Sequence, residues 1–204
     1  DAALQIKDIS QCESTGFGSN ISNFYLRSSN GFSGGYKKTA NQLFCSAIAG
    51  SGSSMERDFA FEGRVFFNDL PNPASIGRLA ATRAAKRLNP RKPPTGSYPV
   101  LFDHRISSSL IGHLTSAING AAVCRGSSWL LDSLNKQILS DNLTLSEDPT
   151  RPKIAGSRPF DGEGLPTSRK NFIENGMLKQ YILDLRSSRK LKLNSSGNAY
   201  RSLS

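Results

Sequence analysis

The sequence predicts an α+β protein, in which an antiparallel β meander and one helix precede a second part that is rich in β structure. Three observations indicate this fold class. Short apolar runs separated by turn residues fill the first 70 residues, and helical spacing of apolar residues follows at 73–88. An Asn-Gly pair then lies between two runs of β-forming residues at 171–185.

The first 70 residues predict four strands. NFYLRSSNGFSGGYKK (23–38) is typical of a hairpin, because Asn30-Gly31 can supply the two positive φ angles of a tight turn. LFCSAIAG (43–50) and ERDFAFEGRVFF (56–67) predict the third and fourth strands. Each run follows its predecessor after a short connection, which favours an antiparallel meander.

A helix is predicted over 73–88. Asn72 can cap it, Pro73 suits its first position, and Asn89-Pro90 is expected to end it. The Pro-rich stretch RKPPTGSYP (91–99) follows. We therefore expect a domain boundary there, with residues 1–92 in one domain and 93–204 in the next.

The second half opens with an apolar run, YPVLF (98–102), which predicts a buried strand. A helix is expected next, starting at Asp103 or at Ser107. Its apolar stripe is formed by Ile106, Leu110, Ala117 and Ala121, and His113 falls on that stripe because it follows Ile106 by seven positions.

The remaining segments are predicted from their apolar content and turn residues. SSWLLDSLNKQIL (127–139) can be a helix or an irregular arm, and 143–164 is expected to be a Pro/Gly-rich connector. NFIENGMLKQYILDL (171–185) predicts a hairpin that turns at Asn175-Gly176, and a short helix is expected at 186–193.

The net charge of +10 admits anionic partners, but it does not favour direct binding to nucleic acid. The most basic segment, RAAKRLNPRK (83–92), lies at the end of the predicted helix, where cations are favourable in any case. It contains no aromatic residue on which a base could stack. We therefore interpret it as a solvated surface.

The cysteine content and the hydropathy of the sequence indicate the cellular compartment that we expect for this chain. The three cysteines, Cys12, Cys45 and Cys124, form no C-x-x-C pair, and so sparse a set is typical of a reducing cytoplasm. No apolar run approaches the roughly 20 residues of a membrane helix. A cytoplasmic chain without a membrane segment is expected, and its start without Met predicts a piece of a longer chain.

Candidate catalytic groups are scattered rather than paired. His104 and His113 are nine positions apart with no acidic residue between them, so they do not form a helical zinc site. The serines at 107–109 lack the spacing of a nucleophile elbow. The Gly/Ser-rich loop at 50–58 lacks the Lys-Ser/Thr pair of a phosphate-binding loop.

A second candidate group lies in the loop SRPFDGEG (157–164). Arg158, Asp161 and Glu163 could act as acid, base or binding groups. In a loop such residues equally well stabilise their own backbone. The spacing does not decide between these alternatives.

Several stretches together resemble the TldD/PmbA family, and its PmbA (TldE) branch in particular. They are GSGSSMERDF (50–59), LIGHLTSAINGAAVCRGSSWLLDSLNKQIL (110–139), SRPFDGEGLPTSR (157–169), IENGMLKQYILD (173–184) and SSRKLKLNSSGNAYR (187–201). The match covers nearly the whole chain in order and about the middle half of a family member. The resemblance implies that residues 1–92 end the family's N-terminal α/β domain, and that 93–204 begin its β-rich C-terminal domain.

The resemblance also implies a function. Members of this bacterial and archaeal family act in proteolysis, and they are associated with peptide antibiotic (microcin) maturation, antitoxin degradation and modulation of DNA gyrase. The TldD branch carries zinc and pairs with a PmbA subunit in a heterodimer that cleaves unfolded peptides.

The TldD-branch zinc motif, H-E-x-x-x-H, aligns with the predicted helix of this chain. Anchoring on Gly126-Ser127-Ser128 places Ile111, Gly112 and Ser116 at the His, Glu and His positions. None of these residues can hold zinc or activate water. The resemblance therefore implies no metal, no cofactor and no catalytic residue in this chain, and zinc in the TldD-like partner. His113 is then expected to pack on the helix stripe or to face the partner.

The resulting hypothesis is a PmbA-like subunit, silent by itself, that supports a TldD-like metalloprotease acting on unfolded peptides. His113, Arg158, Asp161 and Glu163 are the residues predicted to contact the partner or the peptide. The edge at 171–184 could take the peptide as an added strand. The alternative is a non-enzymatic regulator of DNA gyrase or of another nucleic-acid machine.

Overall fold

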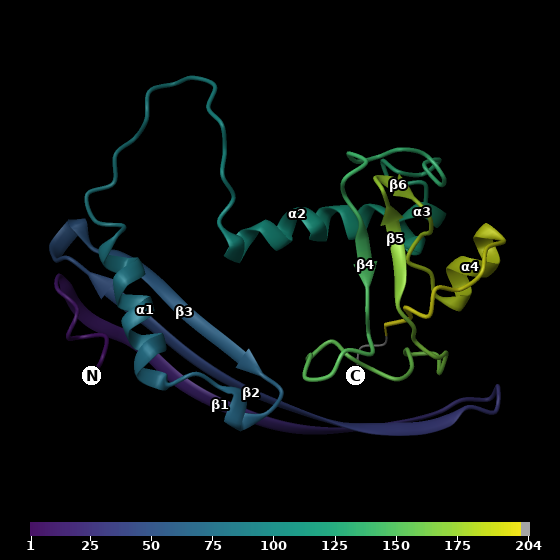
Figure 1. Ribbon diagram of the computed structural model, residues 1–204, viewed down its shortest axis with the longest axis horizontal. Helices are drawn as coiled ribbons and strands as arrows, with labels where there is room; N and C mark the ends of the chain where they lie inside the picture. Colours follow the sequence, from purple (N-terminus) through teal and green to yellow (C-terminus); the bar gives the residue numbers. More distant parts are fainter. Residues whose placement is uncertain (201–204) are drawn as a thin grey trace. The chain divides into compact units, whose positions relative to one another are not determined.

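The computed structural model describes residues 1–200 and divides the chain into two compact units (Figure 1). Unit 1 comprises residues 1–24, 37–97 and 153–155. Unit 2 comprises 25–36, 98–152 and 156–204. Both contain helices and antiparallel strands, which confirms the α+β class.

Unit 1 is built on a three-stranded sheet in the order β1-β2-β3, where β1 is Ile9–Arg27, β2 is Ser33–Ala49 and β3 is Glu56–Arg64. β2 and β3 are antiparallel, with Cys45 opposite Ala60. The meander is therefore present, but it has three long strands rather than four short ones. The two runs expected as separate strands after Gly31 form the single strand β2, because Thr39 and Asn41 stay in the sheet and donate their side-chain hydrogen bonds to Val65 O.

The β1–β2 turn lies at the predicted position with a different geometry. Gly31 has φ +93, whereas Asn30 stays outside the positive-φ region. The turn is closed by bonds from Gly31 N to Ser28 O (3.1 Å) and from Ser28 N to Phe32 O (2.9 Å). Asn30 contributes through its side chain, whose Oδ1 accepts from Phe32 N.

The helix α1 (Pro73–Ala85) covers one face of this sheet (Figure 1). Its small buried residues Ala80, Ala81 and Ala84 pack in one core with residues of β2, so the helix can approach the strands closely. α1 begins where predicted and ends three residues earlier than expected, in turns that lead to Asn89 at φ +56. The 3-10 turns Gly52–Ser54 and Phe67–Asp69 flank β3.

The cap of α1 gives a first prediction. Asn72 Oδ1 accepts a hydrogen bond from Ala74 N at 2.9 Å, and this satisfies one of the free amide groups at the helix start. We expect Asn72→Ala to lower the free energy of unfolding of unit 1 by about 1 kcal/mol. Urea denaturation followed by circular dichroism measures this. Ser53→Ala, at an exposed position outside the helix, serves as the control, and equal midpoints for the two variants would contradict the prediction.

Unit 2 begins differently from the expectation. Residues 98–102 form no strand, and Leu101 is 97% exposed, so the predicted buried strand is wrong. A short apolar run indicates a strand only if neighbouring backbone is available to pair with it. Within the described residues 1–200, no β-bridge forms at 98–102, and the chain passes directly into a helix.

Two helices follow. α2 (His104–Ala117) is capped by Asp103, whose Oδ1 accepts from Arg105 N at 2.9 Å, so the helix starts at the first of the two predicted positions. α3 (Gly120–Cys124) is a short continuation after Asn119. The segment 127–139 is irregular rather than helical, and it is held by Tyr181, whose hydroxyl donates to the carbonyls of Leu130 and Leu131.

The sheet of unit 2 has the order β4-β5-β6, where β4 is Leu145–Glu147, β5 is Lys170–Glu174 and β6 is Met177–Leu178. The β5–β6 turn confirms the predicted hairpin, since Asn175 (φ +50) and Gly176 (φ +74) are both left-handed. β4 falls in the segment expected to be a connector. Its pairing partner lies 23 or more positions away, and local sequence does not reveal such a partner.

The core of unit 2 lies between its sheet and helices. Ile118, Ile173 and Leu178 are completely buried at its centre, and α4 (Leu185–Leu191) follows the sheet at about the predicted position. The tip of the β1–β2 hairpin also belongs to this unit. There the rings of Phe32 and Tyr36 pack edge-on against Phe160, at centroid distances of 4.8 and 5.2 Å.

Among residues 1–200, no helix combines the length and the apolar character that crossing a membrane would require.

Candidate functional site

An exposed apolar surface is the most distinctive feature of unit 2. It comprises side chains from the start of α2 and the segment just before it, each at least 45% exposed: Val100, Leu101, Phe102, Ile106, Leu110 and Ile111. We call this set the α2 apolar surface. Exposed apolar side chains that gather on one segment in this way typically mark a contact with another protein surface.

The two ends of α2 differ in packing. Leu114 and Ala117, in its second half, are 8% and 5% exposed and belong to the core of unit 2. Ile106 and Leu110, in its first half, are about half exposed. Of the four residues in the predicted stripe, Ala117 is buried, whereas Ile106, Leu110 and Ala121 are exposed. The predicted stripe is therefore covered at one position only within the described part of the chain.

His113 lies where the covered and uncovered halves of α2 meet. It is exposed, so the expectation that it packs on the stripe is wrong. It follows Leu110 by three positions and therefore shares a side of the helix with the α2 apolar surface. Contact with a partner stays a prediction for this residue.

The residues at the zinc-motif positions do not fit a metal ion. Ile111, Gly112 and Ser116 are exposed on α2 and offer neither an imidazole nor a carboxylate. His104 is also at the surface, with Nδ1 3.4 Å from Asp103 Oδ1. Within residues 1–200, no three His, Cys, Asp or Glu side chains lie close enough together to hold a metal ion.

Asp103, the residue that caps the N-terminus of α2, has a lowered pKa. The backbone hydrogen bond from Arg105, assisted by its guanidinium group, holds the pKa of Asp103 below its ordinary value. Because the folded pKa is lowered, this contribution is present at neutral pH and is lost as the pH falls through that value. The cap thus contributes to the stability of the start of α2 near neutral pH.

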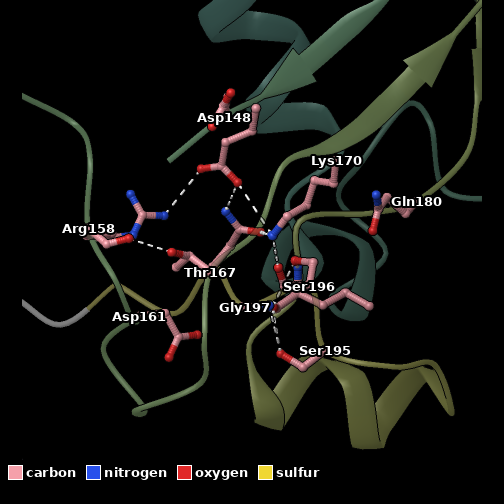
Figure 2. Close-up of polar contacts among 12 residues, drawn as sticks. Asp148, Arg158, Asp161, Thr167, Lys170, Gln180, Ser195, Ser196 and Gly197 are labelled. Atoms are coloured by element: carbon pink, nitrogen blue, oxygen red, sulfur yellow. Dashed lines mark hydrogen bonds and ion pairs between the residues drawn. The ribbon is translucent and has the colours of Figure 1, made fainter. Parts of the chain in front are cut away.

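The loop at 157–164 is organised around a buried carboxylate. Asp161 is 2% exposed, and its oxygens accept hydrogen bonds from the backbone N–H groups of Glu163, Leu165 and Ala199 at 2.9 to 3.0 Å. Figure 2 shows Asp161 on its loop, below Arg158 and Thr167. Asp161 therefore joins its own loop to the segment 196–199, which we call the C-terminal segment.

Arg158 takes part in a second polar cluster. It lies 3.3 Å from Glu147 of β4, and Glu147 also approaches Lys170 of β5 at 3.6 Å and accepts from Asn198 at 2.7 Å. In Figure 2 the side chains of Arg158 and Lys170 approach the same place from opposite sides. Lys170 also donates to Ser196 O. The cluster joins β4, β5 and the C-terminal segment.

Glu163 completes the loop. Its Oε2 accepts from Leu185 N at 2.8 Å, which caps the start of α4. The polar groups of Arg158, Asp161 and Glu163 are thus engaged within unit 2, and this favours the alternative in which they stabilise their own loop. Glu147 and Lys170 were not identified from the sequence, because their contact depends on β4, which was not predicted.

The hairpin edge proposed to receive a peptide is covered. β5 is the central strand of its sheet. On the far side of β6, Leu178 N donates to Lys136 O (3.0 Å), and Asn135 N donates to Leu178 O (2.7 Å). An added strand would have to displace the segment at 135–138, so the expectation of a free edge at 171–184 is wrong.

Comparison with known protein families accounts for both units. Residues 1–88 match the PmbA/TldA metallopeptidase central domain, and residues 95–204 match the PmbA/TldA metallopeptidase C-terminal domain. The chain is 42% identical over 199 residues to Metalloprotease PmbA of Escherichia coli O157:H7 and 34% identical to its Haemophilus influenzae homologue. These alignments cover 97% of this chain and 44% of each relative, so the chain spans less than half of their length.

Solved structures show the same fold. A Bacteroides thetaiotaomicron protein described as a candidate modulator of DNA gyrase superposes with a TM-score of 0.89 at 30% identity, over 97% of this chain and 46% of the other. TldE from Thermococcus kodakarensis has a TM-score of 0.72 at 20% identity, over 92% of this chain and 42% of the other. The matches cover both units, and the chain therefore belongs to the PmbA/TldD metallopeptidase family.

Proposed function

We propose that this chain is part of a PmbA-like subunit that binds no zinc and supports a TldD-like metalloprotease subunit acting on unfolded peptides. In this assignment residues 1–92 and 93–204 are successive domains of the subunit. The zinc ion belongs to the TldD-like partner, and the complex works in the cytoplasm on substrates of the family's kind, such as peptide antibiotic precursors and antitoxins.

The observation that carries this proposal is the α2 apolar surface together with the residues beside it. Anchoring the resemblance on Gly126-Ser127-Ser128 would place the TldD-branch zinc motif on α2, with Ile111, Gly112 and Ser116 at its ligand and base positions. None of these side chains is a zinc ligand, and Ile111 instead belongs to the α2 apolar surface. A helix that has lost catalytic donors and gained apolar surface is suited to binding a partner.

A substitution at the centre of this surface tests the proposal. We expect Leu110→Asp in the full-length protein to weaken its association with the TldD-like subunit at least ~30-fold, because a charge would be buried in an apolar contact. Isothermal titration calorimetry measures the affinity. Ser108→Asp introduces the same charge at an exposed position that lies about 160° around the helix from Ile106 and Leu110, and it should weaken the association much less than Leu110→Asp does.

Peptidase assays on an unfolded peptide complete the test. Activity is expected only when both subunits are present, to be abolished by a zinc chelator, and to fall with Leu110→Asp in parallel with binding. If Leu110→Asp and Ser108→Asp bind the TldD-like subunit with equal affinity, α2 is not part of the interface. Chelator-sensitive activity of this subunit alone would contradict the zinc-free assignment.

The descriptions of two structural relatives favour a second candidate function. The proteins from Bacteroides thetaiotaomicron and Thermotoga maritima are described as candidate modulators of DNA gyrase, and the net charge of +10 on this chain admits an anionic partner. A regulator that acts through DNA phosphates would bind DNA with an affinity that falls steeply as salt increases. Fluorescence anisotropy with duplex DNA at several salt concentrations separates this function from the peptidase role.

A further inference from the structure

Two of the three cysteines meet inside unit 1 although they are 33 positions apart. Cys12 is on β1 and Cys45 is on the neighbouring strand β2, and their Sγ atoms are 3.5 Å apart. Cys12 Sγ also lies 3.5 Å from Ser46 O. Both side chains are free thiols.

The two thiols differ in their surroundings. Cys45 is 3% exposed, and burial, followed by its contact with Cys12, raises the pKa of Cys45 to about 11. Cys12 is half-buried and belongs to an edge strand, most of which is exposed. Reagents in solution should therefore meet Cys12 first, with Cys45 held behind it.

The pair can be reached from solution. Both thiols line an open cavity of about 580 Å³, whose wall also includes Phe17, Leu43 and Ile76. Cys124 is separate, in unit 2, with Sγ 3.8 Å from Ser187 O. It therefore provides an internal comparison for a cysteine that has no neighbouring thiol in the described chain.

We propose that Cys12 and Cys45 form a reactive dithiol that small disulfides oxidise reversibly to a cross-strand disulfide between β1 and β2. A disulfide requires the sulfur atoms to approach to about 2.05 Å, so they must close by about 1.5 Å. Rotation of the Cys12 side chain, on the edge strand β1, would supply that movement. The modification would fix β1, an edge strand that the sheet holds through β2 alone, to its neighbour.

The chemistry balances with oxidised glutathione as the oxidant. The Cys12 thiol first gives its proton to solvent. The thiolate then attacks one sulfur of the reagent, so a mixed disulfide forms, and one glutathione leaves as a thiolate that takes up a proton. Cys45 then gives its proton to solvent, and its sulfur attacks the sulfur of Cys12. The second glutathione leaves as a thiolate and takes up a proton. In total, two protein thiols are oxidised and one small disulfide is reduced to two thiols.

Peptide mapping tests the proposal directly. The full-length protein is equilibrated with oxidised glutathione, alkylated to quench free thiols and digested with trypsin. Trypsin should place Cys12 in the peptide 8–27, Cys45 in 39–57 and Cys124 in 106–125. We expect peptides 8–27 and 39–57 to be recovered joined, with a mass two hydrogens below their sum, and to separate again on reduction.

Variants separate the proposed pair from random oxidation. In Cys45→Ser the peptide 8–27 should accumulate a glutathione adduct that has no second thiol to resolve it, whereas Cys124→Ser should leave the cross-link unchanged. Recovery of 8–27 and 39–57 as separate alkylated peptides, or of either joined to 106–125 instead, would overturn the proposal. So would a stable adduct on Cys12 in the unsubstituted protein.

Discussion

Gly176→Ala is expected to abolish the native packing of unit 2, with a loss of about 4 kcal/mol in the free energy of unfolding. Gly176 has φ +74, a conformation that costs an L-residue about 1–2 kcal/mol. A β-carbon there would lie 2.2 Å from Gln137 Nε2, 2.3 Å from Leu139 O and 2.6 Å from Ser140 O. Two of these atoms are backbone, so they cannot rotate away.

The backbone of Gly176 is also hydrogen-bonded to the segment 138–143. Its N–H donates to Leu143 O at 2.7 Å, and its carbonyl accepts from Ile138 N and Leu139 N. A shift that relieved the clash would stretch these bonds. The measurement is chemical denaturation followed by circular dichroism. Gly156→Ala is the matched control, since no atom lies within 4 Å of its added β-carbon, and it should stay within about 0.5 kcal/mol of the parent. Similar midpoints for both variants would show that the turn can relax.

Asp161→Ala should lower the free energy of unfolding by a similar amount, about 4 kcal/mol, because it removes the acceptor for three backbone N–H groups at once. The carboxylate is 2% exposed, so water cannot replace it without opening the loop. The bond to Ala199 N ties down the C-terminal segment, and we expect the region around it to lose protection against amide hydrogen exchange.

Two further variants make this prediction specific. Asp161→Asn keeps one acceptor oxygen but turns an NH2 group toward N–H donors, so it should be destabilised nearly as much. Asp141→Ala removes an exposed carboxylate of the same unit and should have little effect. If Asp161→Ala unfolds like Asp141→Ala but loses peptide or partner binding, Asp161 is a contact residue rather than a structural one.

The features that the sequence predicted well depend on neighbours within a few positions. Asn72 and Asp103 cap helices through the amide groups two residues ahead, and Asn175-Gly176 makes its own turn. Such chemistry is complete in a short window, so it can be read without the fold.

The features that were missed depend on distant partners. β4 exists because β5 pairs with it, and Glu147 acquires Arg158, Lys170 and Asn198 only through that pairing. At 98–102 the opposite holds: an apolar run predicts a buried strand, yet in the part of the chain that the structure describes no strand pairs with it. Apolar content predicts burial only on average, and the exposed side chains of Val100 and Leu101 are exceptions to it.

The grouping of the hairpin tip with unit 2 has a consequence for biosynthesis. Phe32 and Tyr36 pack on Phe160, a residue that leaves the ribosome more than a hundred positions later. A nascent chain can therefore complete the α1 face of the sheet early, while the aromatic tip stays uncovered until translation has passed Phe160. A pause in translation within that interval would prolong the exposure of these rings. A chaperone that binds nascent chains could then bind to them.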